Sequence, residues 1–150
     1  MKKILVAVDG SERSKKAAEK GALIASSLGA EVTLMNVITE TVTTPASGVS
    51  SSMSIETLQE VMEQKEQEIK GNAEKILRED AQYFEELGVD VKKVMRYGNP
   101  ADVLCNYAEE KGFDMIVMAD KGHGGVKRFL LGSISDKVVR HAQISVLVVK

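Results

Sequence analysis

Glycine residues cluster in one segment of the chain, close to a sequence that suits the start of a helix. Gly122, Gly124 and Gly125 fall within four positions, and Gly132-Ser133 follows shortly afterwards. Glycine has no Cβ, so a loop of this kind can adopt positive φ angles and bring its amides close to a ligand. Concave runs of amide N–H groups bind anions, and a helix N-terminus favours phosphate. The segment therefore predicts a phosphate site between a glycine loop and a helix start.

Asp9 is a second residue whose side chain could contribute to a functional site. It follows an apolar run and precedes Gly10-Ser11. A carboxylate at the end of a strand can contact polar groups of a ligand. An alternative interpretation is that Asp9 is a plain turn residue before Gly10 and Ser11.

Side chains that commonly perform catalysis are few. His123 lies in the glycine segment, but no Ser or Cys nucleophile with an orienting acid accompanies it, so we interpret it as a solvent-facing loop residue. Cys105 has no obvious basic partner and is interpreted as a small helix residue. The sequence contains neither a Walker motif nor an evident base that would activate water against a γ-phosphate. We predict no catalytic residues and, at most, slow nucleotide hydrolysis.

The elements that must position these residues alternate between strands and helices. Apolar runs predict strands at residues 3–8, 31–37, 89–95, 114–118 and 145–149. Helical spacing of apolar residues predicts helices between Ser11 and Gly29, over 55–87, from Asn99-Pro100 to about 111, and over 133–141. Thr39 to Ser54 is rich in Ser and Thr and predicts a mobile loop.

This alternation predicts one α/β domain over residues 1–150, with a doubly wound parallel sheet between two layers of helices. Ligands of such sheets bind at the carboxyl ends of the strands, where the winding direction reverses. Asp9 follows the first strand and the glycine segment follows the fourth. We therefore expect these two sites to form one crevice.

Composition and charge exclude several classes of partner. The chain carries 20 Lys and Arg against 22 Asp and Glu, which leaves no basic excess for nucleic acid binding. No apolar run approaches the roughly 20 residues of a membrane span, and the apolar run at the N-terminus stops at Asp9. The single cysteine, Cys105, agrees with a reducing compartment. We expect a cytoplasmic protein that binds neither nucleic acid nor a membrane.

The glycine segment resembles the nucleotide loop of universal stress proteins, Gly-x2-Gly-x9-Gly-Ser/Thr, with Ala119, Gly122, Gly132 and Ser133 in its four positions. Residues 3–12, KILVAVDGSE, resemble the opening strand and acidic turn of that family, and the order of elements matches from end to end. The resemblance implies a five-stranded sheet of order 3-2-1-4-5, in the Rossmann-like arrangement of adenine nucleotide alpha hydrolase-like proteins. It also implies a stress-response role and a homodimer that pairs through the last strand.

The resemblance further implies a site for ATP, ADP or AMP, with Mg²⁺ or Mn²⁺ held weakly through Asp9. The adenosine side would be lined by Ala7, Val8, Asp9 and Val37, with Val37 at the adenine. The ribose would lie near Met118 and Ala119. The phosphates would meet Gly122, Gly132, Ser133 and Ile134.

Two residues depart from the family pattern. Ala119 replaces a glycine and restricts positive φ, so it could alter the turn or crowd the ribose. Asp120 brings a negative charge to the mouth of an anion site, where Lys121, Lys127 and Arg128 could offset it. Both departures favour an alternative function, a dimeric interaction scaffold with a vestigial pocket that does not bind ATP.

Two further alternatives concern single residues. Ser133 and Asp136 form a capping-box pattern, so either could serve only the start of the helix. Asp9 could be the phosphoacceptor of a flavodoxin-like domain, which would require a second acid beside it and another at the end of a central strand. Ala119 stands at that strand end, and this reading is therefore disfavoured.

Overall fold

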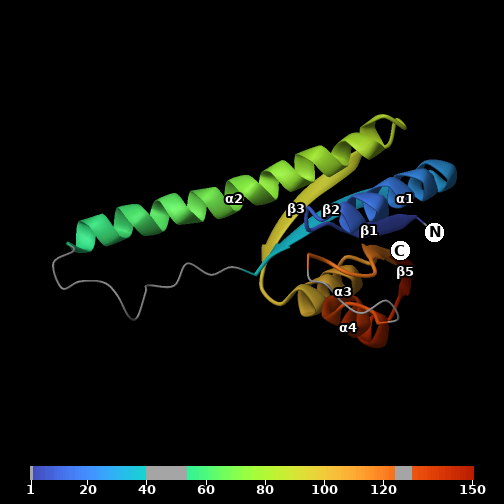
Figure 1. The fold of residues 1–150 in the computed structure, drawn as a ribbon. Helices are drawn as coiled ribbons and strands as arrows, with labels where there is room; N and C mark the ends of the chain where they lie inside the picture. The colour runs from blue at the N-terminus through green and yellow to red at the C-terminus, as the bar shows by residue number, and fades with distance from the viewer. Residues whose placement is uncertain (1, 40–53, 124–129) are drawn as a thin grey trace.

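The computed structural model describes residues 2–39, 54–123 and 130–150 of the chain. Strands and helices alternate through them in the order expected from the sequence (Figure 1). The strands are β1 (Lys3–Ala7), β2 (Glu31–Ile38), β3 (Val91–Tyr97), β4 (Met115–Ala119) and β5 (Ser145–Val149). The helices are α1 (Glu12–Leu28), α2 (Ile55–Glu85), α3 (Pro100–Glu110) and α4 (Ser133–His141).

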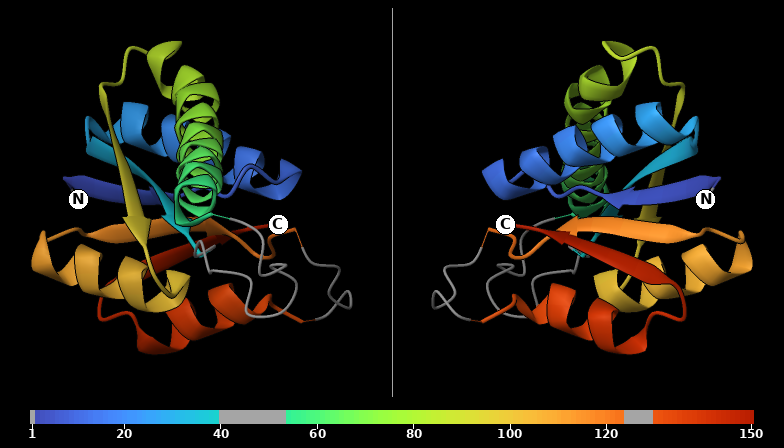
Figure 2. Two further views of the ribbon diagram at one scale, coloured as in Figure 1. Left: turned by 90° about the vertical axis from the view of Figure 1, so that its left-hand side faces the viewer. Right: turned by 90° about the vertical axis from the view of Figure 1, so that its right-hand side faces the viewer.

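The strands form one parallel sheet of order β3-β2-β1-β4-β5, which confirms the predicted doubly wound α/β fold. Helices α1 and α2 cover one face, and α3 and α4 cover the other (Figure 2). The central strand β1 is apolar on both sides because its residues alternate between two cores. Ile4 and Val6 pack toward α1 and α2, whereas Leu5 packs toward α3 and α4.

Local sequence signals fix the helix that follows β1. The side chain of Ser11 accepts a hydrogen bond from the Ser14 amide at 3.1 Å and caps α1, as predicted. Gly29 ends the helix with a φ of 59°, a left-handed conformation that favours glycine. The start of α1 is therefore held immediately after Asp9, at the carboxyl end of β1.

Two predicted elements differ from the structure by two residues at a boundary, whereas several strand ends differ by one residue. Helix α2 ends at Glu85 rather than Leu87, and β3 spans 91–97 rather than 89–95. The turn after the helix explains both shifts, because the Val89 amide donates to the Phe84 carbonyl and pairing with β2 starts at Val91. The mobile loop expected from Thr39 to Ser54 falls on residues 40–53, which are outside the described residues.

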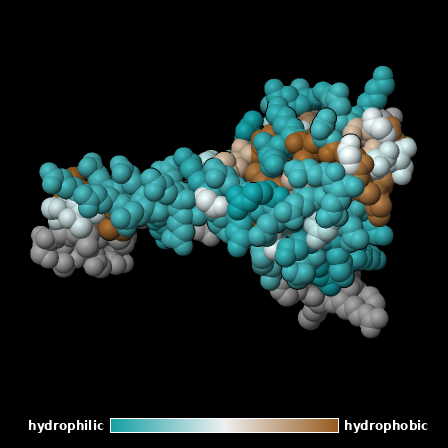
Figure 3. All heavy atoms as spheres, turned by 90° about the horizontal axis from the view of Figure 1, so that it is seen from above, coloured by the Kyte–Doolittle hydropathy of each residue, from teal (hydrophilic) through white to brown (hydrophobic). Residues whose placement is uncertain are grey.

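Helix α2 extends well beyond the body of the domain (Figure 1). Its buried residues all lie in its second half, from Ala73 to Phe84. The N-terminal part of the helix forms a projecting arm whose surface is largely hydrophilic (Figure 3). No helix among the described residues is both long and apolar enough to cross a bilayer.

Candidate functional site

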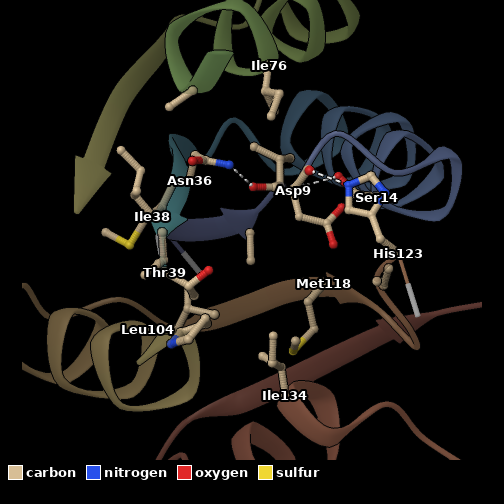
Figure 4. A pocket seen from close by; sticks show the side chains of 18 of the residues that line it. Asp9, Ser14, Asn36, Ile38, Thr39, Ile76, Leu104, Met118, His123 and Ile134 are labelled. Carbon is tan, nitrogen blue, oxygen red and sulfur yellow. Dashed lines mark hydrogen bonds between the residues drawn. The ribbon is translucent and has the colours of Figure 1, made fainter. Parts of the chain in front are cut away.

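A cavity of about 750 Å³ lies at the carboxyl ends of β1, β2 and β4, beneath α2 and beside the start of α4. This is the crevice that the order of the elements predicts. Every residue that the resemblance indicates lies in its wall, as do side chains from α2 and α3 (Figure 4). The ten predicted residues in the wall are Ala7, Val8, Asp9, Val37, Met118, Ala119, Gly122, Gly132, Ser133 and Ile134.

Asp9 has a turn function through one carboxylate oxygen, and its other oxygen accepts no hydrogen bond from the described residues. Its Oδ1 accepts a hydrogen bond from the Ser11 amide at 2.9 Å, and its own amide donates to Ser14 Oγ at 3.0 Å. The interpretation of Asp9 as a plain turn residue is therefore correct for Oδ1. No hydrogen bond from the described residues reaches Oδ2, which lies over Gly122 in the cavity wall. This oxygen is available to a ligand.

Gly122 and His123, the described residues at the start of the glycine segment, approach the Asp9 turn very closely. A Cβ on residue 122 would lie 2.6 Å from Asp9 Oδ2, so a larger residue there would require the Asp9 carboxylate to move. The imidazole of His123 contacts the same turn, with Nε2 2.9 Å from the Asp9 carbonyl oxygen. His123 is exposed, as predicted from the sequence, but its contact with Asp9 was not expected.

Ala119 is compatible with the backbone at its position. It is the last residue of β4 and pairs with Val149 of β5, in extended conformation. No described residue other than glycine has a positive φ. The turn altered by a missing glycine, which the sequence suggested, is therefore not found at Ala119.

Asp120 does not lie at the mouth of the cavity, which corrects the expectation from the sequence. Its side chain is buried outside the cavity wall and accepts two hydrogen bonds from Arg13 Nη1, at 2.5 and 2.7 Å. Arg13 lies in the first turn of α1, 107 residues away. No local pattern in the sequence identifies Arg13 as the partner of Asp120. The guanidinium of Arg13 neutralises the Asp120 carboxylate, which was expected to oppose an anion.

The start of α4 corrects two further expectations. Gly132, not Ser133, is the capping residue, and no side chain caps the helix; Asp136 instead pairs with Arg140 at 3.0 Å. The capping-box interpretation is therefore wrong. The Gly132 amide donates to the Asp120 carbonyl at 2.8 Å, so it is already engaged.

The first intrahelical bond of α4 runs from the Asp136 amide to the Gly132 carbonyl. The amides of Ser133, Ile134 and Ser135 precede this bond and have no acceptor within the helix. They lie in the cavity wall with the positive end of the helix dipole. This geometry suits an anion.

Sequence reasoning missed the contribution of α2 to the cavity. Six residues of one helix face enter the wall: Lys65, Glu68, Ile69, Asn72, Ala73 and Ile76. Their spacing is helical, but no local pattern reveals which strand ends the helix crosses. Ile76 also covers the Asp9 turn, because its side chain lies 2.9 Å from where a Cβ on Gly10 would be.

Asn36 is a second missed residue. It is buried near the end of β2, and its Nδ2 donates to the Val8 carbonyl at 2.9 Å. This bond continues the contact between β1 and β2 beyond the last pair of their ladder, Ala7 with Met35. Asn36 therefore fixes the strand ends that form the floor of the cavity.

Two buried titratable groups lie outside the cavity wall. Burial raises the pKa of Asp80, on α2, to about 6; Lys15 opposes this shift, and Glu79, Asp9 and Glu12 add to it. Burial also raises the pKa of the Cys105 thiol, which agrees with an inert cysteine. Among the described residues, no group of three or more His, Cys, Asp or Glu side chains could hold a metal ion. A cation at Asp9 would thus need ligands from a bound phosphate or water.

Three comparisons relate this chain to known proteins. The model of the Universal stress protein family matches residues 1–150. Universal stress protein MJ0531 of Methanocaldococcus jannaschii is 35% identical over 149 residues, which cover 99% of this chain and 82% of the relative. The structure of protein MJ0577 superposes with a TM-score of 0.78 at 27% identity, covering 99% of this chain and 95% of that one.

A further structure is that of a universal stress protein in complex with cAMP. Its TM-score is 0.70 at 24% identity, with coverage of 99% of this chain and 97% of that one. At this level of identity the likeness is one of fold. All three comparisons extend over nearly the whole chain.

Proposed function

Because the chain belongs to the universal stress protein family, we propose that it is a regulatory protein of the stress response that binds an ATP-class nucleotide with little or no turnover. One observation carries the proposal. A single cavity brings together the Asp9 carboxylate, the Gly122 segment and the uncapped start of α4, although these are far apart in the sequence. The complex of a structural neighbour with cAMP adds support for an adenine nucleotide.

In this proposal the adenosine lies over the ends of β1 and β2, against Ala7, Val8 and Val37. The last β1–β2 pair is Ala7 with Met35, so the backbone of Val37 extends past the end of β1. Its N–H and C=O groups can pair with the edge of a base. Met118 and Ala119, at the end of β4, lie at the ribose.

The phosphates lie between Gly122 and the start of α4. Gly132 serves there by its lack of a side chain rather than by its amide, which the Asp120 carbonyl holds. Ser133 and Ile134 donate their amides to the phosphates, and Ser133 adds its hydroxyl. Mg²⁺ or Mn²⁺, where present, is held by phosphate oxygens and by Asp9 Oδ2, directly or through water.

Slow or absent turnover follows from the side chains of the cavity. The histidine in the described cavity lining is His123, and its Nε2 atom is engaged by the Asp9 carbonyl. The carboxylates of the described lining are Asp9 and Glu68, and Asp9 Oδ1 already accepts a hydrogen bond from the Ser11 amide. In this proposal neither carboxylate positions a water molecule at the γ-phosphate. In this proposal the protein acts by binding rather than by chemistry.

The alternative of an interaction scaffold with a vestigial pocket loses the two features that favour it. Ala119 is extended, where alanine causes no strain, and Arg13 neutralises Asp120. The phosphoacceptor alternative needs an acidic cluster at Asp9, and the described residues contain no group of three or more Asp, Glu, His or Cys side chains that could hold a metal ion. Nucleotide binding is therefore the function that the geometry supports best.

We further propose that the protein is a homodimer through β5. This strand is an edge of the sheet, and Val146, Leu147, Val148 and Val149 are all only half-buried in the single chain. An apolar edge strand with unpaired backbone groups is a typical site of pairing between chains.

Isothermal titration of the purified protein with ATP, ADP and AMP, with and without Mg²⁺, tests nucleotide binding. Mass spectrometry of any small molecule that copurifies identifies the natural ligand without assumption. We expect saturable binding of an adenine nucleotide and a higher melting temperature of the bound protein. Absence of binding and of a melting shift at millimolar nucleotide would favour the scaffold function.

A further inference from the structure

The segments that follow β1 and β4 lack a backbone ladder between them. Pairing of these neighbouring strands ends at Val6 with Val117. Beyond this pair the chain diverges into the Asp9 turn on one side and the glycine segment on the other. The proposed ligand lies where these segments separate, so their spacing decides whether both halves of a nucleotide can be held together.

Side chains replace the missing ladder. Arg13 on α1 pairs with Asp120 just after β4, and His123 Nε2 lies 2.9 Å from the Asp9 carbonyl oxygen. The Arg13–Asp120 pair lies outside the cavity wall, whereas Asp9 and His123 both line it. Of these two contacts, the one between His123 and Asp9 therefore borders the proposed ligand.

The acceptor in this contact determines the state of the imidazole. A carbonyl oxygen only accepts hydrogen bonds, so the proton must be on Nε2. A neutral His123 is then the Nε2–H tautomer, and a protonated ring keeps the same donor. The contact persists in both charge states, which suits a fixed structural tie.

We propose that His123 is a positioning residue, which ties the glycine segment to the Asp9 turn before a nucleotide binds and so strengthens the binding of phosphate-bearing ligands in particular. The inference rests on the proposed nucleotide site. The tie acts on Gly122, the residue before His123, where an added Cβ would lie 2.6 Å from Asp9 Oδ2. Segments held in the bound geometry lose less conformational entropy when the ligand arrives. Adenosine contacts mainly the β1 and β2 side and gains little from the tie.

Three variants test this tie by isothermal titration with ATP and with adenosine. His123→Ala should lower ATP affinity by about three- to tenfold, as expected for one lost hydrogen bond, and change adenosine affinity by less than about twofold. His123→Gln keeps an N–H donor and should recover most of the ATP affinity. The matched control is His141→Ala, at the exposed end of α4, which should change neither affinity.

A measurement without ligand separates this inference from the proposed function. Two-bond ¹⁵N–¹H spectra at mildly alkaline pH should show the Nε2–H tautomer for His123. Amide hydrogen exchange of residues 120–123 should be faster in His123→Ala than in the parent. An Nδ1–H tautomer, unchanged exchange, or equal loss of ATP and adenosine affinity would overturn the tie. A parent protein that binds no nucleotide but shows the tautomer and the exchange effect would overturn only the proposed function.

Discussion

Asp9 Oδ2 and Gly122 share one small space at the centre of the site: a Cβ on residue 122 would lie 2.6 Å from that oxygen. Two segments more than a hundred residues apart therefore pack so closely that a single methyl group on residue 122 would meet the Asp9 carboxylate. The lack of a side chain at 122 lets the carboxylate face the cavity and lets the backbone approach a ligand.

Gly122→Ala should lower ATP affinity by at least about tenfold, because the new methyl group must displace the Asp9 carboxylate or the glycine segment. Titration calorimetry with ATP measures the effect. Gly71→Ala is the matched control, since no atom lies within 4 Å of its added Cβ, and it should leave binding unchanged. Equal ATP affinities of the Gly122→Ala and Gly71→Ala proteins would contradict the proposed role of this contact.

Gly132→Val should abolish most ATP binding, because even a Cβ at this position would lie 3.2 Å from the Asp120 carbonyl oxygen and from Lys121 Cα. The branched side chain adds bulk where backbone must approach phosphate. Ser133→Ala removes one neutral hydroxyl contact and should cost only about 0.5–1.5 kcal/mol of binding free energy. Circular dichroism checks that both variants fold. Unchanged ATP affinity of a folded Gly132→Val protein would exclude the phosphate site at α4.

Asp120→Ala should destabilise the fold by roughly 1–3 kcal/mol, because it leaves Arg13 without its buried partner. Partial exposure of the Arg13 side chain favours the lower end of this range. The sequence alone suggested instead that removing Asp120 would strengthen ATP binding. Urea denaturation measures the loss, and Asp136→Ala, which breaks an exposed pair, should change stability by less than about 1 kcal/mol. Similar stabilities of the two variants would contradict a structural role of Asp120.

Asp80→Asn should stabilise the protein at pH 7 by up to about 3 kcal/mol, since one unit of pKa corresponds to about 1.4 kcal/mol. The folded-state pKa of Asp80 is raised from 3.8 to about 6. Its contribution to stability is therefore fully present below pH 3.8 and is lost as pH rises through 6. The gain from Asp80→Asn should accordingly vanish near pH 4. Urea denaturation from pH 4 to 8 measures it, with the exposed Glu79→Gln as control; a gain independent of pH would contradict this account.

Val148→Lys should convert the proposed homodimer to a monomer, because it places a charge on the apolar edge of β5 without touching either core cluster. Leu147→Pro should also break the pairing by removing a backbone donor, but Leu147 packs against the core and the variant could unfold. Sedimentation velocity at micromolar concentration reports the mass. A monomeric parent protein would exclude the dimer.

The sequence by itself determined the fold, because the signals that specify it are local. Apolar runs and helical spacing gave the order of the elements, and Ser11, Gly29 and Asn99 marked helix ends through bonds to residues a few positions away. The order of elements then led to the crevice after β1 and β4. The family resemblance named ten residues, and all ten lie in its wall.

Only the tertiary structure decided which distant groups meet. The partner of Asp120 is Arg13, the acceptor for His123 is the Asp9 carbonyl, and Ile76 of α2 lies over the Asp9 turn. It also decided that the Gly132 amide is engaged while those of the next three residues lack helical acceptors. The physical reason is that hydrogen bonds, ion pairs and burial act over a few ångströms in space. Such distances leave no periodic trace in a chain where the interacting residues stand more than a hundred positions apart.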